Sequence, residues 1–170
     1  MNGSEIERAL RSDRITGEKF VGVFASDSLP KDKEYPGAYI VNTDPSSKPG
    51  QHWIAFFLPE PGRIEVFDSF GKDPVTYSTD FAKWIGKDHV QNSRKTLQSN
   101  STTVCGNFCL FFILLRCYDV TFKDIASILT SNTALNDKFV HKFINKFFNI
   151  KTQLIDRDFM IQSLRRMKSI

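Results

Sequence analysis

Four polar side chains in this 170-residue sequence have the types that thiol chemistry requires. Cys105 can serve as a nucleophile, His52 as the group that takes and returns a proton, and Asp68 as the carboxylate that orients the imidazole. Gln98 precedes Cys105 by seven residues, across Ser-Asn-Ser-Thr-Thr-Val. Its amide N–H and the backbone N–H of Cys105 can face an oxyanion. Together they predict nucleophilic attack on a carbonyl group.

Cys105 lies where a polar loop turns into an apolar run. The hydroxyl groups of residues 101–103 can cap a helix there, and the positive end of the helix dipole then favours the thiolate of Cys105. Residues 108–115 are apolar on all sides, which is typical of a buried helix. The alternative is that Cys105, Cys109 and Cys117 are all ordinary core cysteines.

His52 and Asp68 are expected at the same end of a hairpin. If strands 51–58 and 63–70 pair antiparallel around the turn 59–62, His52 lies opposite residue 69, within one residue of Asp68. A carboxylate in such an apolar strand needs a partner. Taken alone, His52 is a structural strand histidine and Gln98 a solvated loop residue.

The elements that position these residues form a pattern of strands followed by helices. We predict a first helix over 4–10 capped by Ser4, strands over 20–24 and 38–41, a helix over 78–85, and an extended piece over 93–98. Helices over 121–129, 136–148 capped by Asn136, and 151–168 follow. The predicted class is α+β, with a central mixed or antiparallel sheet packed against the buried helix that carries Cys105 at its N-terminus. We expect one domain over 1–170.

The composition of the chain limits its possible binding partners and its cellular compartment. The chain has 23 basic and 19 acidic residues, for a net charge of +4, which permits contact with nucleic acid without requiring it. Lys138, Lys142 and Lys146 form a basic row that is either a solvated helix face or a surface for DNA or an acidic partner. Three cysteines favour a reducing compartment, and the longest apolar stretch is too short for a bilayer. His89 is expected to be solvated and His141 structural. The sequence has no metal-binding motif, so we expect no metal.

Four of these segments together resemble a known family. His52-Trp53, Asp68 within residues 67–71, Gln98 and the segment Cys105–Cys109 match the adenain-like cysteine proteases of adenoviruses in order and in the spacing from Gln to Cys. The resemblance runs over residues 18–118. The SUMO-specific proteases have the same order of His, acid, Gln and Cys, and the two families form one clan.

The resemblance implies a thiol endopeptidase in which Cys105 is the nucleophile, His52 the general base and acid, Asp68 the orienter and Gln98 the oxyanion donor. Trp53 and Gly106 would then bind substrate, Trp53 as a wall of the site and Gly106 by letting the substrate backbone come close. Mammalian adenoviral enzymes have Glu at the position of Asp68, whereas SUMO proteases have Asp.

The resemblance also implies substrates and partners. One expectation is cleavage of viral capsid or core precursor proteins near glycine-containing sites during virion maturation; the alternative is removal of SUMO or another ubiquitin-like modifier. DNA and a disulfide-linked peptide stimulate adenain, but residues 84–97 contain no cysteine that would hold such a peptide. We expect a monomer with no cofactor and no membrane contact, in the host nucleus or cytoplasm and in the virion. A third interpretation is a basic DNA-associated structural protein with a core cysteine.

Overall fold

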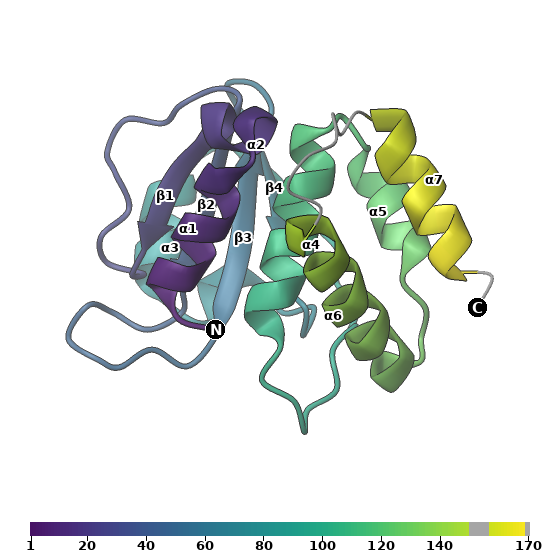
Figure 1. Ribbon diagram of the computed structural model, residues 1–170. Coiled ribbons are helices and arrows are strands. Elements are labelled where there is room, and N and C mark those ends of the chain that lie inside the picture. Colours follow the sequence, from purple (N-terminus) through teal and green to yellow (C-terminus); the bar gives the residue numbers. More distant parts are fainter. Residues whose placement is uncertain (150–156, 169–170) are drawn as a thin grey trace.

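The structure is a computed structural model that describes residues 1–149 and 157–168 (Figure 1). Its elements follow the predicted order of a helical start, a block of strands and a block of helices, so the α+β class is confirmed. The elements are α1 Gly3–Ser12, α2 Arg14–Lys19, β1 Phe20–Phe24, β2 Gly37–Asn42, β3 Trp53–Leu58, β4 Arg63–Phe67, the 3-10 turn Pro74–Thr76, α3 Thr79–Ile85, β5 His89–Asn92, α4 Cys105–Cys117, α5 Phe122–Ile128, α6 Thr133–Asn149 and α7 Arg157–Lys168.

The five strands form one mixed sheet in the order β1-β2-β3-β4-β5. The pairs β1–β2 and β4–β5 are parallel, whereas β2–β3 and β3–β4 are antiparallel. In the β3–β4 hairpin, Ala55 lies opposite Phe67 and Phe57 opposite Glu65. This register differs by one residue from the predicted one. The difference does not separate His52 from Asp68, because His52 directly precedes β3 and Asp68 directly follows β4, so both lie at the same end of the hairpin.

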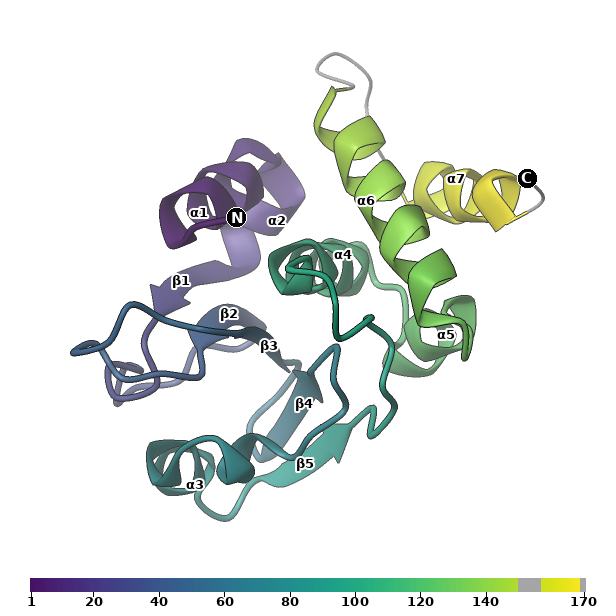
Figure 2. The ribbon, with the colours of Figure 1, turned by 90° about the horizontal axis from the view of Figure 1, so that it is seen from below.

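Helix α4 is the centre of the molecule. Figure 2 shows it between the sheet and α6, and it also packs against α1, α2 and α5. Nearly all its residues are buried, as its apolar sequence predicts. On the sheet side, the ring of Phe112 stacks on Phe67 with centroids 4.8 Å apart. On the other side, Phe111 meets the edge of Phe143 on α6 at 5.3 Å. This packing from both sides fixes the position of the α4 N-terminus.

The opposite face of the sheet is covered by α3. Phe81 and Trp84 of α3 contact Phe56 of β3 at centroid distances of 5.7 and 5.6 Å. Trp84 also meets Tyr39 of β2 at 5.4 Å. The sheet is therefore buried on both faces, which explains why β2 has no exposed residue.

The structure corrects three predicted helix caps. Asn2, not Ser4, caps α1, through a reciprocal pair of hydrogen bonds with Glu5. No capping side chain is found at α4 among the described residues, since the residue before it is Val104. Asn136 lies inside α6 rather than at its start.

Two further differences concern chain segments. The extended piece predicted over 93–98 is not a strand; the strand is β5, four residues earlier, and its polar sequence gave no strand signal. The predicted last helix is found over Arg157–Lys168. The part of that prediction over 151–156 lies outside the described residues, and the single domain over 1–170 stays a prediction.

Candidate active site

Cys105 is the first residue of α4, and its side chain is buried. Burial by itself would raise the pKa of the Cys105 thiol. A hydrogen bond with His52 and the backbone N–H groups of Trp53 and Gly106 outweigh burial, and the pKa is lowered. Cys105 is therefore the thiol in this chain that is set up to ionise.

His52 lies directly before β3 and is 7% exposed. Its backbone carbonyl accepts from the Thr43 N–H at 2.9 Å, which ties it to the end of β2. Its Nε2 lies 2.6 Å from Oδ1 of Asp68, so Nδ1 is the ring nitrogen left for the Cys105 thiol. Burial by itself would lower the pKa of His52, but the hydrogen bonds with Asp68 and Cys105 raise it to about 9.

Asp68 directly follows β4 and has no exposed surface. Besides His52, its carboxylate accepts from the backbone N–H of Phe70 at 3.0 Å and of Lys72 at 2.9 Å. The hydroxyl of Tyr77 donates to Oδ2 at 2.9 Å. Burial opposes ionisation, yet these donors, led by His52, lower the pKa of Asp68. The carboxylate is thus anionic, and every donor holds it in one orientation.

Two aromatic residues that sequence reasoning missed enclose the imidazole. The rings of Phe70 and Tyr77 lie 4.6 and 5.7 Å from the His52 ring, centroid to centroid. Phe70 lies two residues after Asp68, so its place near the site could have been inferred from the sequence. Tyr77 follows the 3-10 turn Pro74–Thr76, and no sequence pattern marks it as a partner of Asp68.

Gln98 lies in the loop before α4 and is 1% exposed, so it is not a solvated loop residue. Its Oε1 accepts from the hydroxyl of Ser69 at 2.7 Å, and its Nε2 donates to the carbonyl oxygen of Thr102 at 2.8 Å. The backbone N–H groups of Leu97 and Gln98 both donate to the Ser69 carbonyl. These bonds place Gln98 beside the residue that follows Asp68, within the loop that ends at Cys105.

Trp53 and Gly106 both lie beside Met1. The indole Nε1 of Trp53 donates to the Met1 carbonyl at 3.2 Å. A Cβ on Gly106 would lie 3.2 Å from Cβ and 3.4 Å from Sδ of Met1. Met1 therefore packs against Gly106, a contact that sequence reasoning missed. Trp53 also lines a pocket of about 280 Å³ formed with the loop 42–50 and the end of β1.

The remaining cysteines and histidines lie elsewhere. Burial raises the pKa of Cys109 well above its usual value and that of Cys117 to about 12, so both stay thiols at neutral pH. His89 is exposed at the start of β5, as predicted. His141 is exposed on α6 but lies 3.0 Å from Asn145 and 3.4 Å from Asn107 of α4. Within the described residues no cluster that could hold a metal is found.

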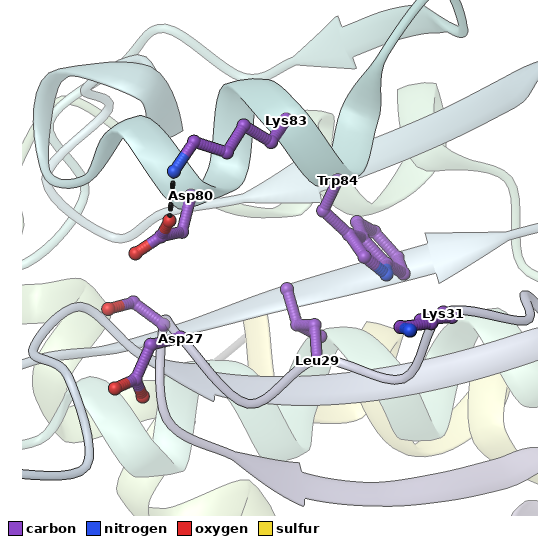
Figure 3. Close-up of a pocket in the computed structure, with 7 residues that line it drawn as sticks. Asp27, Leu29, Lys31, Asp80, Lys83 and Trp84 are labelled. Atoms are coloured by element: carbon purple, nitrogen blue, oxygen red, sulfur yellow. Dashed lines mark hydrogen bonds and ion pairs between the residues drawn. The ribbon is translucent and has the colours of Figure 1, made fainter.

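A pocket of about 340 Å³ between the loop after β1 and α3 contains none of the candidate residues (Figure 3). It is lined by Leu29 and Trp84 and by charged side chains, among them Lys83, which pairs with Asp80 at 2.9 Å. No helix in the described part of the chain is long and apolar enough to cross a bilayer.

Comparison with known proteins points to viral proteases. The cysteine protease of an African swine fever virus isolate from a tick in Malawi is 31% identical over 122 residues, covering 65% of this chain and 43% of the relative. The SUMO-1 cysteine protease of a pig isolate from Kenya is 30% identical over the same coverage. The chain thus matches less than half the length of these curated relatives. No family model matches.

Among solved structures, the crystal structure of an African swine fever virus protease superposes with a TM-score of 0.52 and 21% sequence identity. The match covers 91% of this chain and 68% of that one. It shows the same fold. The resemblance to the clan of adenain-like and SUMO proteases, which the four motifs indicated, is confirmed by the sequence relatives.

Proposed function

We propose that this chain is a cysteine endopeptidase whose nucleophile is Cys105, with His52 as general base and acid and Asp68 as the orienting carboxylate. One observation carries the proposal: Asp68 holds Nε2 of His52 at 2.6 Å, while the pKa of His52 is raised to about 9 and that of Cys105 is lowered. A thiolate beside an imidazolium is the reactive state of a thiol protease. The relatives named as cysteine proteases support the same reaction.

The arrangement supplies each step of amide hydrolysis. The Cys105 thiolate attacks the carbonyl carbon, and the carbonyl oxygen takes the negative charge. The His52 imidazolium gives its proton to the amide nitrogen, the C–N bond breaks, and the amine leaves a thioester on Cys105. Water, which gives a proton to the now neutral His52, attacks the thioester and releases the acid. Thiolate and imidazolium are then restored.

Gln98 is the proposed oxyanion donor. It is buried at the loop that leads into α4, and its Nε2 carries two hydrogens. One is directed at the Thr102 carbonyl at 2.8 Å, and the other makes only a long contact of 3.4 Å with the Thr102 hydroxyl, which an oxyanion can replace. No capping side chain occupies the start of α4 in the described structure, so the backbone N–H of Cys105 can join it. Trp53 is the proposed wall of the substrate groove, with the pocket of about 280 Å³ beside it as a place for a substrate side chain.

The proposed substrates are viral, or virus-like element, precursor proteins cut near glycine-containing sites during virion maturation. The swine fever virus relatives support a viral setting. The alternative, removal of SUMO or a ubiquitin-like modifier, has its own support, since several relatives carry the name SUMO-1 cysteine protease. A panel of precursor peptides and modifier fusions separates the two: cleavage of folded fusions with slow cleavage of short peptides would favour deconjugation.

We also propose a monomer that acts without a cofactor in the host nucleus or cytoplasm and in the virion, with DNA or a peptide as a stimulating partner. Lys138, Lys142 and Lys146 are all exposed on α6, which supports a DNA-facing surface. Replacing the three with Gln should lower the slope of log affinity against log salt by about three for duplex DNA. An unchanged slope in fluorescence anisotropy would remove this surface.

Site-resolved alkylation tests the catalytic proposal directly. Limiting iodoacetamide at mildly acidic pH, followed by mass spectrometry, should modify Cys105 fast and much more slowly after His52→Ala. Cys105→Ala should abolish cleavage and keep the fold, whereas Cys117→Ser is the matched control that keeps activity. Full cleavage by Cys105→Ala would end the nucleophile assignment.

A further inference from the structure

The loop that carries Gln98 is tied to α6 by two adjacent buried residues. Nδ2 of Asn136 donates to the Leu97 carbonyl at 2.9 Å and to the Thr130 carbonyl at 2.8 Å. The Asp137 carboxylate accepts from the Ser99 backbone N–H at 3.3 Å and from the Thr102 hydroxyl at 2.9 Å. The loop is thus held on both sides of Gln98 from a helix more than thirty residues downstream.

Asp137 is the unusual member of this pair. Asp137 is 7% exposed, and in the described part of the chain no salt bridge joins its carboxylate to a basic side chain. A buried carboxylate without a cation is costly unless hydrogen bonds compensate it. The hydrogen bonds that Asp137 accepts come from Ser99 and Thr102, whereas Asn136 also bonds Thr130 within the α5–α6 connection. The charge of Asp137 is therefore directed at the loop.

Both residues that Asp137 binds are directly connected to Gln98. Ser99 is the next residue, and Thr102 supplies the carbonyl that accepts from Nε2 of Gln98 at 2.8 Å. The single proton of the Thr102 hydroxyl is within reach of Asp137 at 2.9 Å and of the Ser99 carbonyl at 3.0 Å, and both acceptors hold Thr102 in the turn. Asp137 thus closes the turn 99–102, and that turn aims the amide group of Gln98.

We propose that Asp137 is a positioning residue for the oxyanion donor, acting on catalysis through Thr102 and Gln98. The inference rests on the proposed function, in which Gln98 donates a hydrogen bond to the oxyanion. It adds a residue from α6, outside the four motifs, to the requirements of the site. Without Asp137 the turn keeps its backbone but loses the anchor that sets the direction of Nε2.

A double-mutant cycle tests this role with the full chain and a Gly-Gly-aminomethylcoumarin peptide as probe. Asp137→Ala should lower kcat roughly 10-fold to 10²-fold, the effect of a small misplacement, with KM within twofold. In the Gln98→Ala background the same substitution should lower kcat no further. Asp137→Asn, which keeps an acceptor oxygen, should lose less. Thr102→Val cuts the same link from the other side and serves if Asp137→Ala does not fold.

Asp13→Ala is the matched control. Its carboxylate likewise accepts from one backbone N–H, of Thr16, and one hydroxyl, of Tyr118, each at 2.8 Å, and kcat should stay unchanged. Alkylation of Cys105 should keep its wild-type rate in Asp137→Ala, because His52 makes the thiolate. Equal losses of kcat with and without Gln98, or no loss, would overturn the positioning role. A wild-type chain that neither cleaves nor alkylates fast would instead overturn the proposed function.

Discussion

At the scale of single residues, the proposed chemistry depends on two opposite pKa shifts with a shared origin. The hydrogen bond between Cys105 and His52 lowers the pKa of the thiol and raises that of the imidazole, so each charge stabilises the other. Asp68 adds a second anion on the far side of the ring. The pair therefore exists as thiolate and imidazolium from the lowered pKa of Cys105 up to about pH 9, where His52 loses its proton.

The pH profile of kcat/KM should report this pair. It should rise as Cys105 ionises, below the usual range of a thiol, and fall as pH passes about 9. Asp68→Asn removes an anion that favours the imidazolium, so the falling limb should move to lower pH. The thiolate then loses part of its counter-charge, and the rising limb should move to higher pH. Asp80→Asn, at an exposed pair with Lys83, is the control and should keep the wild-type profile. A profile of unchanged width in Asp68→Asn would contradict the ion pair.

The other two cysteines give a second residue-scale prediction. Burial raises the pKa of Cys109 and Cys117, so iodoacetamide should label them only after unfolding in urea. Cys109→Ser places a hydroxyl in the apolar core and should lower the free energy of unfolding by about 1–3 kcal/mol, with kcat retained. Labelling of Cys109 in the native protein at a rate near that of Cys105 would contradict this assignment.

At the scale of elements, hydrophobic pattern predicted what is buried and missed what is held by distant contacts. Helix α4 and strands β1 to β4 were predictable because their apolar residues mark them locally. Strand β5 was not, because His-Val-Gln-Asn becomes a strand only by pairing with β4. The predicted cap of α4 failed for a similar reason: the Thr102 hydroxyl lies against Asp137 and the Ser99 carbonyl, and α4 has no side-chain cap.

The C-terminal end of α4 is fixed to the sheet by a buried ion pair between Arg116 and Glu65. Nε of Arg116 donates to Glu65 of β4, whose side chain is 1% exposed. Arg116→Ala should cost about 3 kcal/mol of unfolding free energy in urea, the low end for a broken buried pair, because Arg63 still reaches Glu65 at 3.2 Å. Arg14→Ala, which breaks an exposed pair with Glu18, should cost less than about 0.5 kcal/mol. Equal costs for the two variants would show that the buried pair does not hold α4.

At the scale of the whole molecule, the proposed site lies where three parts of the fold meet. The sheet supplies His52 and Asp68, α4 supplies Cys105, and the loop tied to α6 supplies Gln98. The sequence predicts these four: the start of an apolar helix points to Cys105, a carboxylate in an apolar strand points to Asp68 and its neighbour His52, and the resemblance points to Gln98. Sequence reasoning missed Tyr77, Asp137 and Met1, whose roles come only from long-range contacts that a one-dimensional pattern does not carry.

Gly106 of α4 packs against Met1 and Ile6. In Gly106→Ala the new methyl would lie 3.2 Å from Cβ of Met1 and 3.5 Å from Cδ1 of Ile6. Met1 is 46% exposed and can move aside, and alanine favours a helix over glycine by up to about 1 kcal/mol. The free energy of unfolding should therefore change by less than about 1 kcal/mol.

Activity should respond differently from stability in Gly106→Ala. Gly106 directly follows Cys105, and the resemblance implies that the substrate backbone comes close to it, so kcat/KM should fall at least about 10-fold. Gly17→Ala in α2 is the matched control: its methyl would also meet an atom at 3.3 Å, but away from the site, and kcat/KM should not change. Wild-type kcat/KM in Gly106→Ala would contradict a close approach of the substrate backbone to Gly106.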